Sequence, residues 1–309
     1  MQELIQVAKS VLNNNLHLKE NEHILIVTDS ELVDIAKIFF QAGEELGNET
    51  IMMLMTPRSK SGEEPPFHVS EVMRSVEVVL CITKHSLTHT KARKLASASG
   101  ARIATMPGIT IDMLQKGAIT ADYIEVEKLT ECYSKLLDAG SAVVIKKENT
   151  HLSFSIQGRE SIRSTGIFRE KGESGNLPSG ESYIAPIEDS ANGTILVDGT
   201  IAGIGVLSEP ITLTIENGRL MEASGTDGMK LLELLGDGKG RNIAEFGIGT
   251  NKSARLTGNL LEDEKVFGTV HIAFGSNKSF GGENEAGVHI DCVINEPSVW
   301  IDEKPLLLK

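Results

Sequence analysis

The sequence predicts an α/β N-terminal domain with a parallel sheet covered by helices, followed by a β-rich α+β C-terminal domain. In the first half, short apolar runs alternate with stretches of helical period, as in a parallel sheet with helices on both faces. In the second half, short β-rich runs are separated by Gly, Asn and Asp turns. Glycine follows the same division, because only 7 of the 30 glycines lie in residues 1–140. A length of 309 residues also fits two domains.

The first domain is expected to cover residues 1–140, with strands and helices in turn. Its first apolar residues, from Leu4 to Leu12, repeat at helical spacing and indicate a helix. Apolar runs predict strands at 22–29, 49–56, 76–83 and 101–107. Helical spacing predicts helices at 31–46, 69–74 and 91–99, and near Ile111 and Leu129.

The second domain is expected to cover residues 141–309 and to consist mainly of strands. No linker rich in Pro or Ser precedes it, so the connection is expected to be a short turn. One helix is predicted from Gly228 to Leu235, with Gly236 as the residue that ends it. The β-rich runs lie at 141–147, 151–158, 194–206, 210–218, 269–275 and 288–295.

Composition and charge exclude several classes of partner and location. The formal net charge is −13, whereas proteins that bind nucleic acids or anionic membranes usually carry an excess of positive charge. Aromatic residues make up only 4%, which leaves few side chains to stack on nucleic-acid bases. Three cysteines without a CxxC pair predict neither a disulfide framework nor a zinc knuckle. No signal peptide or membrane-spanning run is recognisable. We therefore expect a cytoplasmic protein that binds neither nucleic acid nor membrane.

The common signatures of nucleotide binding and covalent catalysis are absent from the sequence. The glycine-rich stretches at 236–241 and 247–251 complete neither GxGxxG nor GxxxxGK[ST] after a strand. There is no GxSxG elbow and no HExxH helix. The candidate metal-binding and catalytic residues are therefore the histidines and carboxylates of the second half.

His289 and Asp291 are two residues apart in a predicted strand, so their side chains share one face. His-x-Asp can clamp a metal, although an isolated pair also fits two hydrogen-bonded groups in a partly buried strand. His271 lies in another predicted strand and would add a second imidazole; by itself it fits a packed core residue equally well. Two imidazoles and one carboxylate suit non-haem iron, zinc, cobalt or manganese.

Glu181 and Glu245 could complete this set. Both lie in apolar, glycine-rich surroundings, where a bare carboxylate is costly unless it is paired or bound to a cation. Each also fits a solvated loop residue. Five ligands with three carboxylates would be enough for two adjacent divalent cations that activate a water for hydrolysis.

The segments PSGESYIAP, AEFGIGTN, HIAFG and VHIDCVI, in this order, resemble the metallo-aminopeptidases of the aminopeptidase T family. The resemblance covers the whole second half, and its metal ligands fall on Glu181, Glu245, His271, His289 and Asp291, separated by 64, 26, 18 and 2 residues. It implies a metal-dependent hydrolase in which a metal-bound hydroxide attacks the N-terminal peptide bond. One or two Zn, Co or Mn ions, a small peptide substrate and a homodimer are implied with it.

The sequence departs from this family at its catalytic tyrosine, seven residues after the first metal histidine. Lys278 occupies that position, and the interval between the two histidine strands is short. Lys278 could act as a substitute electrophile that holds an oxyanion, or it could be a solvated loop lysine.

The chain also resembles 2,5-dihydroxypyridine 5,6-dioxygenase, a non-haem iron enzyme that cleaves an aromatic ring. Its Fe(II) triad would fall on His271, His289 and Asp291, with Glu181 and Glu245 outside the metal ligands. The lost tyrosine favours this alternative, or a non-catalytic metal-binding relative, whereas the low aromatic content disfavours a site for a ring substrate.

His89 is the one candidate from the first half. It lies in THTKARK, directly after the predicted strand at 76–83, and ligands of open α/β sheets gather at the carboxyl ends of strands. His89 could act as an acid or base across a cleft between the domains. Alternatively, the segment is a helix start capped by Thr88 or Thr90 with a solvated basic face.

Overall fold

The computed structural model describes residues 1–308, which form two compact units. Unit 1 consists of Met1–Glu127 together with Thr165–Ser179. Unit 2 consists of Lys128–Ser164 together with residues 180–308. Nowhere in residues 1–308 is there a helix with the length and apolar character needed to cross a bilayer.

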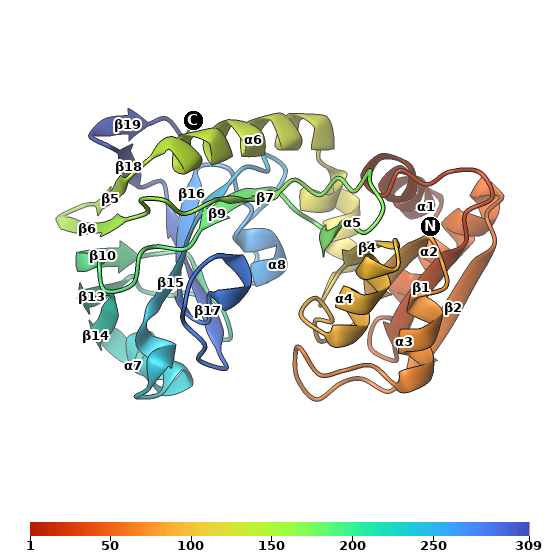
Figure 1. Cartoon of the computed structure of the whole chain (residues 1–309), viewed down its shortest axis with the longest axis horizontal. Coiled ribbons are helices and arrows are strands. Elements are labelled where there is room, and N and C mark those ends of the chain that lie inside the picture. The colour runs from red at the N-terminus through yellow and green to blue at the C-terminus, as the bar shows by residue number, and fades with distance from the viewer. Residues whose placement is uncertain (309) are drawn as a thin grey trace. The chain divides into compact units, whose positions relative to one another are not determined.

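Unit 1 is built on a five-stranded sheet in the order β2-β1-β3-β4-β8, in which every paired strand is parallel. Helices cover both faces, as Figure 1 shows in its red to yellow part. The strands are β1 (Ile24–Asp29), β2 (Thr50–Met55), β3 (Val78–Ile82), β4 (Arg102–Thr105) and β8 (Ser174–Asn176). The helices are α1 (Gln2–Ser10), α2 (Val33–Leu46), α3 (Phe67–Met73), α4 (Lys91–Ala98) and α5 (Ile111–Lys116), with short turns at Val11–Asn15 and Ala118–Thr120.

The sequence explains how these elements begin, end and pack. Every residue of β1 and β3 is buried, as expected for strands covered on both faces. Helix α2 ends at Gly47, whose φ of 85° lies in the left-handed region that glycine tolerates. Helix α4 begins after Thr90, whose hydroxyl accepts a hydrogen bond from the backbone N–H of Arg93. Of the two predicted caps for this helix, Thr90 is the correct one.

Unit 2 contains two antiparallel sheets, in the orders β14-β13-β10-β6-β5-β18-β19 and β12-β11-β17-β16-β15-β9-β7. The first sheet consists of β5 (Ala142–Lys147), β6 (Thr150–Ser155), β10 (Asn192–Val197), β13 (Ile211–Glu216), β14 (Arg219–Ala223), β18 (Ser298–Ile301) and β19 (Lys304–Leu306). The second consists of β7 (Ile162–Ser164), β9 (Glu181–Ile184), β11 (Thr200–Ile201), β12 (Gly205–Val206), β15 (Ile243–Gly249), β16 (Thr269–Gly275) and β17 (His289–Asn295).

A single apolar cluster joins the two sheets of unit 2. Alternate residues of β15, β16 and β17 belong to it together with those of β5, β6, β10 and β13. Helix α6 (Tyr123–Ala139) packs on this unit, because Ser134 and Ser182 share a hydrogen bond of 2.7 Å between their hydroxyls. The other helical segments are α7 (Gly225–Leu235), α8 (Leu260–Asp263) and the turns Lys239–Arg241 and Lys278–Phe280. One face of the second sheet therefore lies in the apolar core, and the side chains of the opposite face can form a functional site.

The predicted fold class is confirmed: a parallel sheet flanked by helices comes first and antiparallel β-rich sheets follow. The division into units differs from the expected boundary near residue 140. Residues 165–179 return to unit 1, because β8 pairs with β4 as its fifth strand. Helix α6 contributes most of its length to unit 2. The β-rich run at 194–206 contains residues of three short strands.

Candidate metal centre

The five predicted metal ligands lie on four adjacent strands of the second sheet of unit 2. They are Glu181 on β9, Glu245 on β15, His271 on β16, and His289 and Asp291 on β17. The residues that alternate with them on these strands contribute to the apolar core. The period of two in a strand therefore places the ligands on the opposite face, away from the core.

Gly247 makes room for His271 on this face. It pairs with His271 on one side and with Tyr183 on the other, so all three share one row across the sheet. A Cβ atom at Gly247 would lie 2.0 Å from Nε2 of His271. The imidazole therefore occupies the space that a side chain at position 247 would fill, and only glycine fits there.

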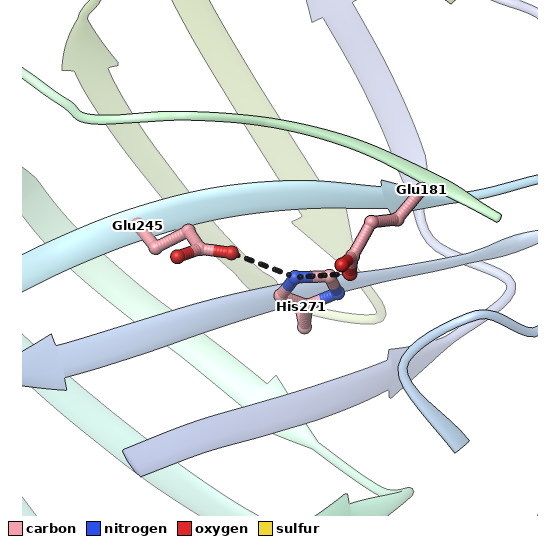
Figure 2. A group of neighbouring side chains, drawn as sticks. All are labelled: Glu181, Glu245 and His271. Atoms are coloured by element: carbon pink, nitrogen blue, oxygen red, sulfur yellow. Dashed lines mark hydrogen bonds and ion pairs between the residues drawn. The ribbon is translucent and has the colours of Figure 1, made fainter. Parts of the chain in front are cut away.

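The first group of potential ligands consists of Glu181, Glu245 and His271, all of them buried. Nε2 of His271 lies 3.2 Å from Oε1 of Glu245 and 3.6 Å from Oε2 of Glu181. Figure 2 shows the two carboxylates approaching the same imidazole from either side. One ring nitrogen and two carboxylate oxygens therefore converge on one point.

The second group consists of Glu245, His289 and Asp291. Nε2 of His289 lies 3.4 Å from Oε2 of Glu245 and 3.4 Å from Oδ1 of Asp291. Nδ1 of His289 lies 2.8 Å from the backbone carbonyl oxygen of Ser276, which can only accept a hydrogen bond. In its neutral form His289 therefore carries its proton on Nδ1 and offers the lone pair of Nε2 to the group, as metal-bound histidines do.

Glu245 belongs to both groups, and each of its oxygens faces a different histidine. The distances of 3.2 to 3.6 Å exceed the roughly 2.7–2.9 Å of a charge-assisted hydrogen bond. Bonds of about 2.1 Å at tetrahedral angles would place two ligand atoms about 3.4 Å apart. The donor atoms of each group are therefore spaced so that they could hold a divalent cation.

The charges of these groups are strongly coupled. Burial would lower the pKa of His271, but the hydrogen bond to Glu245 and the charge of Glu181 raise it to about 9. Burial would raise the pKa of Asp291, but the charge and hydrogen bond of His289 lower it to about 2. The pKa of Glu245 is also lowered, because its hydrogen bonds to the two histidines outweigh its burial. Divalent cations would take the place of the imidazole protons that balance these carboxylates.

A buried lysine that no sequence pattern singled out pairs with the first group. Lys265 has an exposed side-chain fraction of 0%, and its Nζ donates to Oε1 of Glu181 at 2.7 Å and to Glu264. Burial would lower the pKa of Lys265, but the charges of Glu181 and Glu264 raise it, so the ammonium stays charged. Lys265 therefore occupies one oxygen of Glu181 and leaves Oε2 for the group around His271.

Two aromatic residues near the ligands were also missed. The ring of Phe280 packs edge-on against Tyr183, with centroids 5.3 Å apart, and against His289, with centroids 5.9 Å apart. The pKa of Tyr183 is raised well above its ordinary value by burial and then by the charges of Glu245 and Glu181. The phenol is therefore close to the carboxylates of both groups and stays protonated.

The remaining two candidates, Lys278 and His89, belong to neither group of potential ligands. Lys278 has an exposed side-chain fraction of 66%, and its Nζ pairs with Glu285 at 3.0 Å. His89 is exposed in unit 1, directly before Thr90. The structure thus brings the five predicted ligands together, and catalytic roles for Lys278 and His89 stay predictions.

A profile of the family described as "NicX: 2,5-dihydroxypyridine 5,6-dioxygenase" matches residues 3–309. Among characterised proteins, aminopeptidase AmpS of Bacillus subtilis (strain 168) is 25% identical over 186 residues, 52% of this chain and 45% of AmpS. The 2,5-dihydroxypyridine 5,6-dioxygenase of Pseudomonas putida KT2440 is 26% identical over 166 residues, 48% of this chain and 47% of that enzyme. The chain spans about half the length of the curated relatives it matches.

Two solved structures share the fold over nearly the whole chain. The 2,5-dihydroxypyridine dioxygenase from Pseudomonas putida KT2440 has a TM-score of 0.82 at 17% identity, covering 98% of this chain and 95% of that chain. AmpT from Thermus thermophilus has a TM-score of 0.72 at 18% identity, covering 99% and 98%. These comparisons confirm the resemblance of the sequence to both the aminopeptidases and the dioxygenase.

Proposed function

The chain belongs to the 2,5-dihydroxypyridine 5,6-dioxygenase family, and we propose that within this family it is a two-metal hydrolase with aminopeptidase-like activity. One observation carries the proposal. The two groups of potential ligands share Glu245 but divide the histidines, with His271 in one group and His289 in the other. Such an arrangement suits two adjacent cations better than one.

The donor atoms fit divalent cations that accept both imidazole nitrogen and carboxylate oxygen, such as Zn, Co and Mn. Glu181, Glu245 and His271 would hold the first ion. Glu245, His289 and Asp291 would hold the second. Bound there, such ions would supply a water of lowered pKa as the nucleophile and would polarise the substrate carbonyl group.

The protein side chains have distinct parts in this proposal. Glu245 would fix the separation of the two ions, because its oxygens face different histidines. The hydrogen bond from His289 to the Ser276 carbonyl keeps Nε2 of His289 directed at the second group. Lys265 holds Glu181 in place through Oε1. The substrate would be a small peptide with a free N-terminus, as for the aminopeptidase relatives.

A second candidate function is ring cleavage by a single Fe(II), favoured by the family profile that matches residues 3–309. That chemistry would need His271, His289 and Asp291 on one ion, with the two glutamates outside its ligands. The structure instead directs Nε2 of His271 toward Glu181 and Glu245. Within residues 1–308 His271 is not grouped with His289 and Asp291, so iron at a single triad would require His271 to approach those two residues.

Metal analysis followed by two assays separates the candidates. Protein purified without added metal is analysed for bound ions, and is then loaded in turn with Zn, Co, Mn or Fe(II). The proposal predicts two ions per chain and amino-acid release from an unblocked peptide but not from its N-acetylated form. One iron with oxygen consumption on 2,5-dihydroxypyridine would support the dioxygenase instead. Bound metal without turnover of either substrate would indicate a binding protein and contradict both.

A further inference from the structure

Tyr183 differs from the other two tyrosines in having an uncommitted hydroxyl. The hydroxyl of Tyr133 donates to the Leu307 carbonyl at 2.7 Å. The hydroxyl of Tyr123 donates to the Ala118 carbonyl at 3.3 Å. Within residues 1–308, no hydrogen-bond partner is found for the hydroxyl of Tyr183, whose side chain is only partly buried. The first two phenols are structural, whereas that of Tyr183 is available to a ligand.

The strand places this hydroxyl group on the face of the metal ligands. Ser182, the neighbour of Tyr183 in β9, bonds Ser134 of α6 on one side of the sheet. Tyr183 and Glu181 therefore point to the other side, since side chains alternate along a strand. Tyr183 shares its row with Gly247 and His271, and Gly247 has no side chain to separate them.

Phe280 connects Tyr183 to the second group of ligands. Its ring packs edge-on against Tyr183 and against His289. Phe280 lies in a loop that is well anchored: the buried side chain of Asn277 donates to the Ala244 carbonyl at 3.3 Å and accepts from the backbone of Asn284 at 2.8 Å. The ring of Tyr183 is therefore packed on Phe280, which in turn contacts His289 of the second group.

We propose that the Tyr183 hydroxyl donates a hydrogen bond to the substrate carbonyl oxygen and stabilises the negative charge that develops on it. This inference rests on the two-metal hydrolase proposed above. A preorganised neutral donor beside such an oxygen stabilises the transition state more than the ground state. Lys278 in the loop after β16 is exposed, and its ammonium pairs with Glu285 at 3.0 Å.

The position of Tyr183 also indicates which kind of substrate side chain would lie beside its hydroxyl. The edge-on pair of Tyr183 and Phe280 presents apolar ring surface next to His289. Covering apolar surface with another apolar group removes it from water, which is favourable in free energy. The residue whose carbonyl Tyr183 contacts is therefore expected to carry an apolar side chain.

The test is Tyr183→Phe, which removes the hydroxyl and keeps the ring on Phe280. We expect kcat for an unblocked leucyl peptide to fall roughly 100-fold, the loss typical of removing one oxyanion donor, with KM changed less than about threefold. Binding of leucine phosphonic acid, a tetrahedral mimic, should weaken by a similar factor, while binding of leucine and the content of two ions stay unchanged. Tyr133→Phe is the matched control and should lower thermal stability without changing kcat.

The outcomes separate this inference from the function on which it rests. An active wild type whose Tyr183→Phe variant keeps its kcat and its phosphonate affinity would remove the role of Tyr183 alone. A variant that loses kcat and metal together would show a structural role and also overturn the inference. A wild type with two ions but no peptide turnover would remove the proposed hydrolase and the inference with it.

Discussion

The imidazole of His271 lies directly over the backbone of Gly247, so a Cβ at position 247 would come within 2.0 Å of Nε2 and 2.2 Å of Cε1. The row Tyr183–Gly247–His271 therefore depends on a missing side chain in its centre. The ring of His271 on β16 therefore extends over β15 and reaches Glu181 on β9, so that residues of two non-adjacent strands belong to one site.

Gly247→Ala is expected to displace the His271 ring and to weaken the first metal group. We predict one ion per chain instead of two, and a loss of peptide turnover of about 100-fold, since a misplacement of about 1 Å at a reacting centre has this effect. Metal content and kcat measure the result. Gly238→Ala is the control, because a Cβ at position 238 meets nothing within 4 Å. Equal metal content in both variants would contradict the role of Gly247.

Each outer carboxylate belongs to only one group. Glu181→Gln should remove the ion beside His271, and Asp291→Asn should remove the ion beside His289, so each variant should retain one ion. Glu245→Gln removes a charge common to both groups and should weaken both ions. Metal analysis after dialysis distinguishes the three variants. Complete loss of metal in Glu181→Gln with full retention in Glu245→Gln would contradict the bridging position of Glu245.

Lys265 is a buried member of an ion pair, and replacing it by methionine leaves Glu181 without its partner. We predict a loss of about 3–5 kcal/mol in the free energy of unfolding, the cost of breaking a buried pair by removing one partner. The apparent affinity for the first ion should also fall, because Oε1 of Glu181 is no longer held. Denaturant unfolding and metal titration measure the two effects. Wild-type values of both would contradict the anchoring role of Lys265.

Lys278→Met tests the alternative in which this lysine replaces the family tyrosine. Its exposed pair with Glu285 should contribute little to stability, because water and salt screen such pairs. We predict unchanged metal content and a kcat within about twofold of wild type, since the Lys278 ammonium faces Glu285. A kcat loss as large as that of Tyr183→Phe would assign the electrophile to Lys278 instead.

The sequence was sufficient to predict the fold class, and its resemblance to known families singled out the five side chains that the structure brings together. Periodicity distinguishes the parallel sheet from the antiparallel ones, and the spacing of two in His289-Ile290-Asp291 places both ligands on one face. Strand β8 could not be predicted, because its three residues, Ser174–Asn176, carry no apolar run and pair with a strand far back in the chain.

The rest of the site depends on contacts that local patterns do not encode. The run Glu262–Lys265 contains four consecutive charged residues, which is typical of a solvated surface, yet Glu262, Asp263 and Lys265 are buried. Their burial follows from partners distant in sequence, as in the pair of Lys265 with Glu181. The proposed role of Tyr183 could not be predicted from the sequence either, because it depends on the pairing of Tyr183 with Gly247 and on its contact with Phe280.

The most direct test of two cations bridged by Glu245 is anomalous diffraction from crystals of the zinc- or cobalt-loaded protein. We predict two peaks per chain, one about 2.1 Å from Nε2 of His271 and Oε1 of Glu245, the other at the same distance from Nε2 of His289 and Oε2 of Glu245. A single peak bound by both histidines and Asp291, with Glu245 turned away, would contradict it.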